Sequence, residues 1–469
     1  MKQTNAIARS LNPAIFFCCL WPVGAVAHPA EQGLVLLLPT ELYNWGGTLA
    51  VVASIILISA VSHRLLAQCY QSIAFGRGKA GARAVHITSL LSTLAVFALI
   101  YIGFTGPTDP QRNLLPLTIW TGWWVGVFIV QGLIVDVWRW IDPWAGASRF
   151  AFGQGDPILR MPAWIGAWPA VALFLGFQIF MLADLAPSDP GRLATYVFGY
   201  WVFTFVGIGI FGRKAWCAQV ECFSVLFDLI GSLRAVQTQG TFRIGLPGHT
   251  SLQRAPLDTA QAVFCLTILV SGSFDGLSET FWWLGHIGIN PLEFPGRSAV
   301  VIETITGLIG ANIAGILIFA AAIWGGQRLV AGQANLDFRT AFNSFAITIL
   351  PIALGYHFAH YLVSFLVQGQ YLLAAIGDPL ARGWNLLGLG NTTVTTGFLN
   401  STETVKPILL AKVGMVVTSH IVSIAMAHVL AGRFVQKRRD LVLLQLFLCI
   451  LMVLYTFFGL WLLSTPRGA

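Results

Sequence analysis

About ten apolar runs, most of them close to twenty residues long, dominate this sequence. A helix needs roughly 20 residues to cross the hydrocarbon core of a bilayer. Only helices and closed barrels satisfy their backbone in lipid, and barrel strands alternate over roughly ten residues instead of staying continuously apolar. The sequence therefore predicts an all-α, polytopic transmembrane helical bundle. The expected spans are Leu42–Val61, Val85–Phe104, Leu117–Val137, Ala163–Ala183, Leu193–Phe211, Ala260–Ser273, Ala299–Trp324, Phe342–Val367, Val405–Leu430 and Leu441–Leu463.

The composition agrees with a membrane protein, because 56% of the residues are hydrophobic and only 10% are charged. About a quarter of the residues are charged in an ordinary soluble domain. The net charge of +8 raises nucleic acid as a partner, but the Lys and Arg residues lie in short loops beside the apolar runs. We therefore expect the lipid bilayer as the main partner, with other membrane subunits as an option, and no nucleic acid.

Basic residues occupy every second loop of the chain, which is the positive-inside pattern. Such a pattern fits ten spans with the N-terminus exported, as expected for a multi-pass protein of a bacterial inner (plasma) membrane. The basic loops carry Arg64, Arg77, Lys79 and Arg83, then Arg139, Arg149 and Arg160, then Arg213, Lys214, Arg234, Arg243 and Arg254, then Arg328 and Arg339, and finally Arg433 to Arg439.

The first 27 residues read as a cleavable secretory signal peptide. Lys2 and Arg9 form its basic end, an apolar stretch follows, and Ala25-Val26-Ala27 matches the small-residue cleavage rule. Cleavage would leave His28 as the mature N-terminus on the outer side, and residues 28–469 as one transmembrane domain. The alternative is an uncleaved first helix, in which His28 is a plain loop residue.

Two stretches predict irregular structure around the sixth run. Asp275-Gly276 follows a run that is short for a span, so we expect the helix to break there, either as the lip of a site or as a simple turn. The stretch Val220–Leu233 has an apolar stripe with Glu221, Ser224 and Asp228 off it. That pattern predicts an amphipathic helix on the cytoplasmic surface.

Two short motifs carry little weight. Gly207 to Gly212 matches a dinucleotide-binding fingerprint, but no βαβ unit surrounds it, so close helix packing is the better interpretation. Cys217 and Cys222 are five apart, and plain packing is a better interpretation than metal ligation.

Histidines inside apolar segments are the sharpest functional signal. His357 and His360 lie on one face of the run Phe342–Val367, and His420 and His428 lie in the run Val405–Leu430. An ionisable group at membrane depth is costly and marks a functional site by default.

We expect an outer cluster of His357 and His360 with Glu303, which Asp275 and the N-terminal His28 could close from the loops. Imidazole and carboxylate ligands suit a divalent transition metal, copper or zinc, and the amine and imidazole of His28 favour copper. His420, nearer mid-depth, is a further candidate ligand. We expect the two histidine-bearing runs to form the arms of one helical hairpin, Phe342 to Arg433. A bis-histidine haem across these two arms is a less favoured interpretation, and buried histidines with a purely structural role are the alternative.

Several stretches together resemble a family of bacterial membrane proteins described as fenitrothion hydrolase-like, that is, membrane organophosphate hydrolases. The resemblance spans most of the mature chain. Ser419 and Val429 depart from its pattern, in which Gly and Asp are usual. The stretches are Asn113–Pro116 with Trp123-Trp124, Trp138–Trp144, Phe274–Trp283, Tyr356–Tyr361, Asp378–Trp384, and Ser419-His420 to Ala427-His428.

The resemblance implies a metal-dependent hydrolase of organophosphate-type esters with an outward-facing site. A metal-bound water would attack phosphorus, with His357 and His360 as ligands and Asp275 or Glu303 as a ligand or base. Two alternatives stay open: a binding or transport protein for copper or a small solute, and a membrane subunit of an electron-transfer complex.

Overall fold

The computed structural model of the chain describes residues 35, 37–77, 81–153, 155–238, 240–293, 296–332, 336–388 and 393–467. The expected signal peptide and His28 lie outside these residues. Cleavage of the signal peptide and a role for His28 as the N-terminal residue therefore stay predictions.

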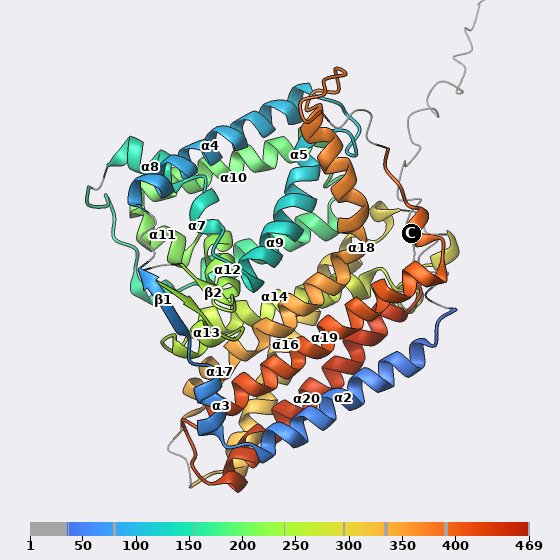
Figure 1. Cartoon of the computed structure of the whole chain (residues 1–469). Coiled ribbons are helices and arrows are strands. Elements are labelled where there is room, and N and C mark those ends of the chain that lie inside the picture. The colour runs from blue at the N-terminus through green and yellow to red at the C-terminus, as the bar shows by residue number, and fades with distance from the viewer. Residues whose placement is uncertain are drawn as a thin grey trace, which may run out of the picture.

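Within the described residues, nine helices are long and apolar enough to cross a membrane (Figure 1). A tenth apolar helix, α9 (Trp168–Ala183), is shorter. Each expected run corresponds to one of these ten segments, which confirms a helical membrane bundle, while the count of ten spans stays a prediction. The nine are α2 (Thr40–Ala60), α4 (Ala82–Thr105), α5 to α6 (Leu114–Leu133), α10 (Pro190–Phe211), α14 (Thr259–Ser278), α16 (Val301–Leu329), α17 to α18 (Phe338–Gly377), α19 (Thr402–Ala431) and α20 (Arg438–Ser464).

A small antiparallel sheet accompanies the helices, in the order β1-β3-β2. Its strands are Ile73–Arg77, Val236–Gln237 and Thr241–Ile244 for β1, β2 and β3. Figure 1 shows the sheet at the same end of the bundle as α3 (His63–Cys69), α13 (His249–Gln253) and α17 (Phe338–Ala346). We call this end the sheet end; its loops include several of the basic segments, as the alternation of charge predicts.

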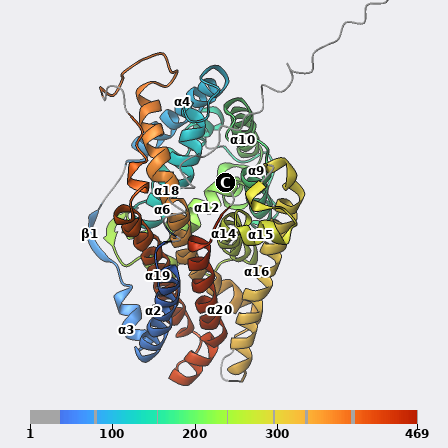
Figure 2. The same ribbon diagram turned by 90° about the vertical axis from the view of Figure 1, so that its right-hand side faces the viewer.

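Helices α2, α16, α18 (Leu350–Gly377), α19 and α20 run side by side through the molecule (Figures 1 and 2). The predicted hairpin is present, because α18 packs along α19. Gly355 lies directly against the side chain of Ser419, where an added Cβ would meet Ser419 Cβ and Oγ. The absence of a side chain at Gly355 thus lets the two arms approach closely.

Helix α14 is continuous, so the predicted break at Asp275-Gly276 is wrong. Asp258 and Gln261 form a capping box at its start, and the helix ends only at Ser278. Gly276 lies where a Cβ would collide with the hydroxyl of Tyr356. The missing side chain at Gly276 therefore allows close packing against α18 and does not mark a turn.

The surface helix expected within Val220–Leu233 is also wrong. Helix α12 (Cys222–Gly231) is buried against α6 (Phe128–Leu133) and α9, and Glu221 accepts hydrogen bonds from the first backbone N–H groups. Residues off the expected stripe, such as Cys222, Leu226 and Leu229, are also fully buried. Because apolar side chains surround the helix, it has no broad polar face to turn to water.

The third span contains eleven residues of π-helix, η2 (Leu117–Val127), between α5 (Leu114–Pro116) and α6. It packs against α18 and carries Trp120, Trp123 and Trp124. Trp123 lies edge-on to Phe223 of α12, with the ring centroids 4.7 Å apart. Insertions of π-helix are often found at functional sites, and here one lies beside the histidines of α18.

Candidate functional site

Asp275 and His360 form a buried pair between α14 and α18. His360 Nε2 lies 3.2 Å from Asp275 Oδ2, and the two side chains are only 7% and 8% exposed. Both lie towards the end of the bundle opposite the sheet end, because Asp275 is within a turn of the end of α14. A carboxylate held at this depth needs such a partner, since an unpaired ion in an apolar interior is very unfavourable.

Tyr361 completes this cluster, which we call the Asp275 site. Its hydroxyl donates to Asp275 Oδ2 at 2.5 Å and lies 3.9 Å from the sulfur of Met181 on α9. Asp275 Oδ2 thus accepts from Tyr361 and from the His360 ring. Because the neighbouring residues 360 and 361 of one helix reach the same oxygen, the cluster locks α18 to α14.

His357 lies one turn before His360 and is held by the π-helix. Its Nε2 lies 2.9 Å from the carbonyl oxygen of Trp124, and its ring stacks on Phe128 with the centroids 4.1 Å apart. A carbonyl can only accept, so Nε2 of His357 carries a proton. The same reasoning gives His360 a proton on Nε2, towards the carboxylate.

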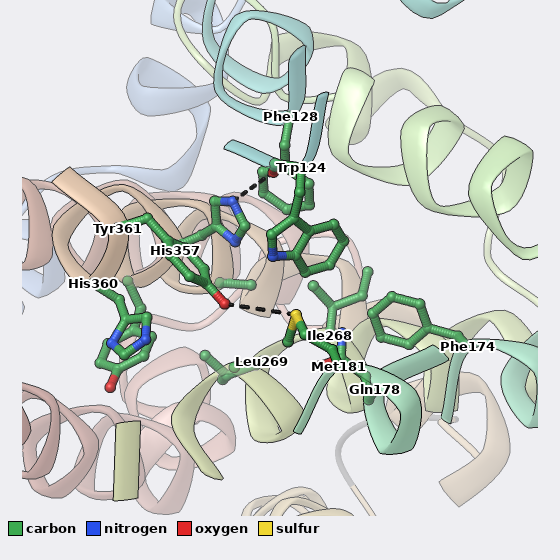
Figure 3. Close-up of a pocket in the computed structure, with 13 residues that line it drawn as sticks. Trp124, Phe128, Phe174, Gln178, Met181, Ile268, Leu269, His357, His360 and Tyr361 are labelled. Carbon is green, nitrogen blue, oxygen red and sulfur yellow. Dashed lines mark hydrogen bonds between the residues drawn. The ribbon is translucent and has the colours of Figure 1, made fainter. Parts of the chain in front are cut away.

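A small cavity lies beside these residues (Figure 3). Its volume is about 20 Å³, counted as the space open to the centre of a water molecule. That is room for about one water. Helices α9, α14 and α18 and the π-helix all contribute to the lining, which is Trp124, Phe128, Phe174, Gln178, Met181, Ile268, Leu269, Gly272, Ala353, Tyr356, His357, His360 and Tyr361.

Four of the lining residues have a buried polar atom without a hydrogen-bond partner in the described part of the chain. These atoms are Trp124 Nε1, Gln178 Oε1, Tyr356 Oη and His360 Nδ1. Trp124 Nε1 is close to the Tyr361 hydroxyl but closes no hydrogen bond of standard geometry with it. Buried polar atoms are nearly always satisfied in folded proteins, so this gathering points to a polar occupant such as water or a small ion.

The structure brings together only part of the predicted site. Asp275, His357 and His360 meet at or beside the cavity, whereas Glu303 lies half-buried in the first turn of α16 and does not line it. His420 is 1% exposed in α19, with Nδ1 2.8 Å from the carbonyl of Val416, and it does not line the cavity either. The histidines of the two arms therefore do not share this cavity.

The described residues do not form a complete metal-binding group. Among the described residues, no group of three or more His, Cys, Asp or Glu side chains is arranged to hold a metal ion. Asp275 binds the ring of His360 instead of pointing with it at a common centre. A metal here would need a further ligand from outside the described residues, for which His28 is the sequence-predicted candidate.

Among the polar lining residues, sequence reasoning gave no site role to Gln178, Trp124 or Tyr356, although the stretches of the resemblance include Trp124 and Tyr356. Gln178 carried a usable signal, because it is the one strongly polar side chain within the apolar helix α9 and is 2% exposed. Such a residue in a span marks an interior-facing position. Trp124 carried no such signal, because tryptophan is as common at the edge of a membrane as inside a protein.

Comparison with known proteins adds no assignment. No protein-family model, no curated protein and no solved structure matches this chain. Its function must therefore be argued from the site itself.

Proposed function

We propose that this protein is a multi-pass membrane transport protein in which the Asp275 site carries protons, alone or together with a small polar solute. The observation that carries this proposal is the buried carboxylate–imidazole pair beside a cavity of water size. Ionisable pairs inside membrane bundles mark ion and substrate pathways and proton relays.

The side chains can pass a proton along a short chain. His360 holds its proton at Nε2 against Asp275, and its Nδ1 has no hydrogen-bond partner among the described residues. An imidazole can accept a proton at one nitrogen and release one from the other. A water in the cavity would supply the proton to Nδ1, and Asp275, held also by Tyr361, would receive one from Nε2.

Proton flux in liposomes tests this function. Purified protein would be reconstituted around a trapped pH-sensitive dye, and the internal pH followed after an external pH jump. We expect the wild type to accelerate equilibration, and His360→Gln and Asp275→Asn to reduce the rate to that of empty vesicles. Glu403→Gln, an exposed residue of α19 away from the cavity, is the matched control. Equal rates for the wild type, both variants and empty vesicles would contradict proton transport.

A metal-dependent hydrolase is the second candidate, from the resemblance to membrane organophosphate hydrolases. One observation favours it: each of His357 and His360 has one ring nitrogen held by an oxygen atom, as metal-ligating histidines usually do. Against it, the cavity has room for about one water and would have to widen to admit a triester.

Metal content and hydrolysis decide this second candidate. Copper and zinc would be measured in protein purified from its membrane, together with release of the phenol from a phosphorothioate triester. The hydrolase requires bound metal that is lost in His357→Gln and His360→Gln but kept in Glu403→Gln. Protein without metal and without hydrolysis would leave the resemblance without a catalytic meaning for this chain.

A further inference from the structure

A second, very different depression lies at the sheet end of the molecule. It is lined by Asp228, Ser232, Arg234, Gln237, Thr250, Gln253 and Arg254, and we call it the arginine basin. Its volume is about 280 Å³, counted as the space open to the centre of a water molecule. Every residue of its lining is polar or charged, and all but Asp228 can donate a hydrogen bond.

The basin is built from the elements that precede α14. Asp228 belongs to α12, Gln237 to β2, and Thr250 and Gln253 to α13. The backbone N–H of Ser251 donates to the carbonyl of Ser232, and the two serine hydroxyls lie 2.6 Å apart. These bonds hold α13 against the end of α12, so the basin is a fixed feature of the fold.

Arg234 is the strongest sign of a ligand. The residue is only 8% exposed, its guanidinium donates to the carbonyl of Gly231, and its Nε has no hydrogen-bond partner among the described residues. A buried guanidinium with an unsatisfied donor is unfavourable unless an acceptor completes its bonding, and an anion is the strongest acceptor for it.

The net charge of the lining is positive, because it holds two arginines and one aspartate. Asp228 pairs with Arg254 at 2.5 Å, and their side chains are 61% and 26% exposed. Arg243 is also close, since its charge and that of Arg234 act on the buried His249. Burial lowers the pKa of His249, and these two charges lower it further. The lowered pKa favours the neutral form of His249, so the positive charge beside the basin comes from the arginines.

We infer that the arginine basin binds a phosphate-bearing anion. Arginine presents planar pairs of donors that match phosphate oxygens, and charge-assisted bonds of this kind are the strong ones. The glutamine amides and the Thr250 hydroxyl supply further donors around the same space.

The neighbouring sheet favours a phospholipid headgroup as the source of that phosphate. Ile73, Phe75 and Ile244 share one face of the β1–β3 pair and are 66%, 59% and 41% exposed. Arg243 lies on the other face, beside its pairing partner Gln237 of the basin lining. An apolar face next to a basic, polar pocket fits the boundary between acyl chains and headgroups.

Binding to detergent-purified full-length protein tests the inference. Native mass spectrometry would measure adducts of phosphatidylglycerol against those of phosphatidylcholine, and calorimetry would measure binding of inorganic phosphate. We expect Arg254→Gln and Arg234→Gln each to weaken binding of the anion about tenfold, which corresponds to the loss of one charge-assisted hydrogen bond. Asp228→Asn should strengthen it, because it removes the competing carboxylate from Arg254.

Arg149→Gln, an exposed arginine of α8 (Ala145–Phe152) outside the lining, is the matched control for lost charge. A response of phosphatidylglycerol alone identifies a lipid site, and a response of inorganic phosphate identifies a site for a free phosphate. If neither ligand responds to Arg254→Gln or Asp228→Asn more than to Arg149→Gln, the inference is overturned. Arg254 is partly exposed, so its variant keeps the test valid even where Arg234→Gln fails to fold.

Discussion

The Asp275 site and the arginine basin place charged groups in opposite surroundings within one chain. The Asp275–His360 pair is more than nine-tenths buried beside a cavity of about 20 Å³, whereas Asp228–Arg254 is open to a basin of about 280 Å³. Charges interact strongly where the dielectric constant is low and weakly in water. A short distance to a carboxylate therefore does not by itself decide how much the contact contributes to stability.

The two sites also differ in what they leave unsatisfied. Four polar atoms of the cavity lining lack hydrogen-bond partners within the described part of the chain, in a space that holds about one water. In the basin the unsatisfied group is a guanidinium, in a space wide enough for a polyatomic ion. The first arrangement suits transit of protons and water, and the second suits retention of an anion.

The largest expected effect is a difference in labelling between the sheet end, near the arginine basin, and the opposite end of the bundle, towards which the Asp275 site lies. Cys69 is exposed at the sheet end, and Thr108 is exposed in the loop after α4 at the other end. The alternation of basic loops predicts that Cys69 faces the cytoplasm. In intact cells, an impermeant maleimide should label a Thr108→Cys chain at position 108 and leave Cys69 unlabelled. Labelling of Cys69 in unbroken cells would reverse the orientation.

Asp275→Asn and Asp228→Asn compare the two carboxylate pairs directly. Removing the charge of Asp275 leaves His360 and Tyr361 without their carboxylate in an apolar interior, which should destabilise the fold by about 3 kcal/mol. Removing the charge of Asp228 should change stability by less than about 1 kcal/mol, because exposed pairs contribute little. Equilibrium unfolding in mixed detergent micelles measures both. Equal effects would mean that the Asp275 pair is solvated.

Gly276→Ala perturbs the Asp275 site without changing its charge. The added methyl group would collide with the hydroxyl of Tyr356, so that side chain or helix α14 must shift, at a cost of about 1–3 kcal/mol. Gly272→Ala is the matched control one turn earlier, since its methyl group meets only Tyr356 Cδ1 at 4.0 Å. We expect thermal denaturation in detergent to separate the two variants. A tolerated Gly276→Ala would mean that Tyr356 has room to move.

The sequence predicted the features that depend on one segment of the chain, and it failed where neighbouring helices decide. The ten apolar segments and the pairing of α18 with α19 were predictable, because hydropathy and the depth of the histidines depend on single segments. Helix α12 was not, since whether Glu221 faces water or caps a buried helix depends on which other helices surround it. The meeting of Asp275 with His360 was expected, whereas Glu303 does not line the cavity beside them. The break predicted at Gly276 was wrong, because tight packing and a turn both select glycine.

The smallest expected effect lies in the loop after α18. Asp378 accepts from the backbone N–H groups of Arg382 and Gly383 at 2.8 and 2.7 Å. Its limited burial opposes ionisation, but these bonds prevail and lower the pKa of the carboxyl below its usual value. A carboxyl with a lowered folded-state pKa stabilises the loop above its unfolded-state pKa, and this stabilisation is lost as the pH falls through the folded-state pKa. Amide hydrogen exchange of residues 382–384 should therefore speed up in acid relative to the intrinsic rate, and Asp378→Asn should give faster exchange at neutral pH. Neither change should reach the Asp275 site, so proton flux that follows the Asp378 titration would link two regions that this structure keeps separate.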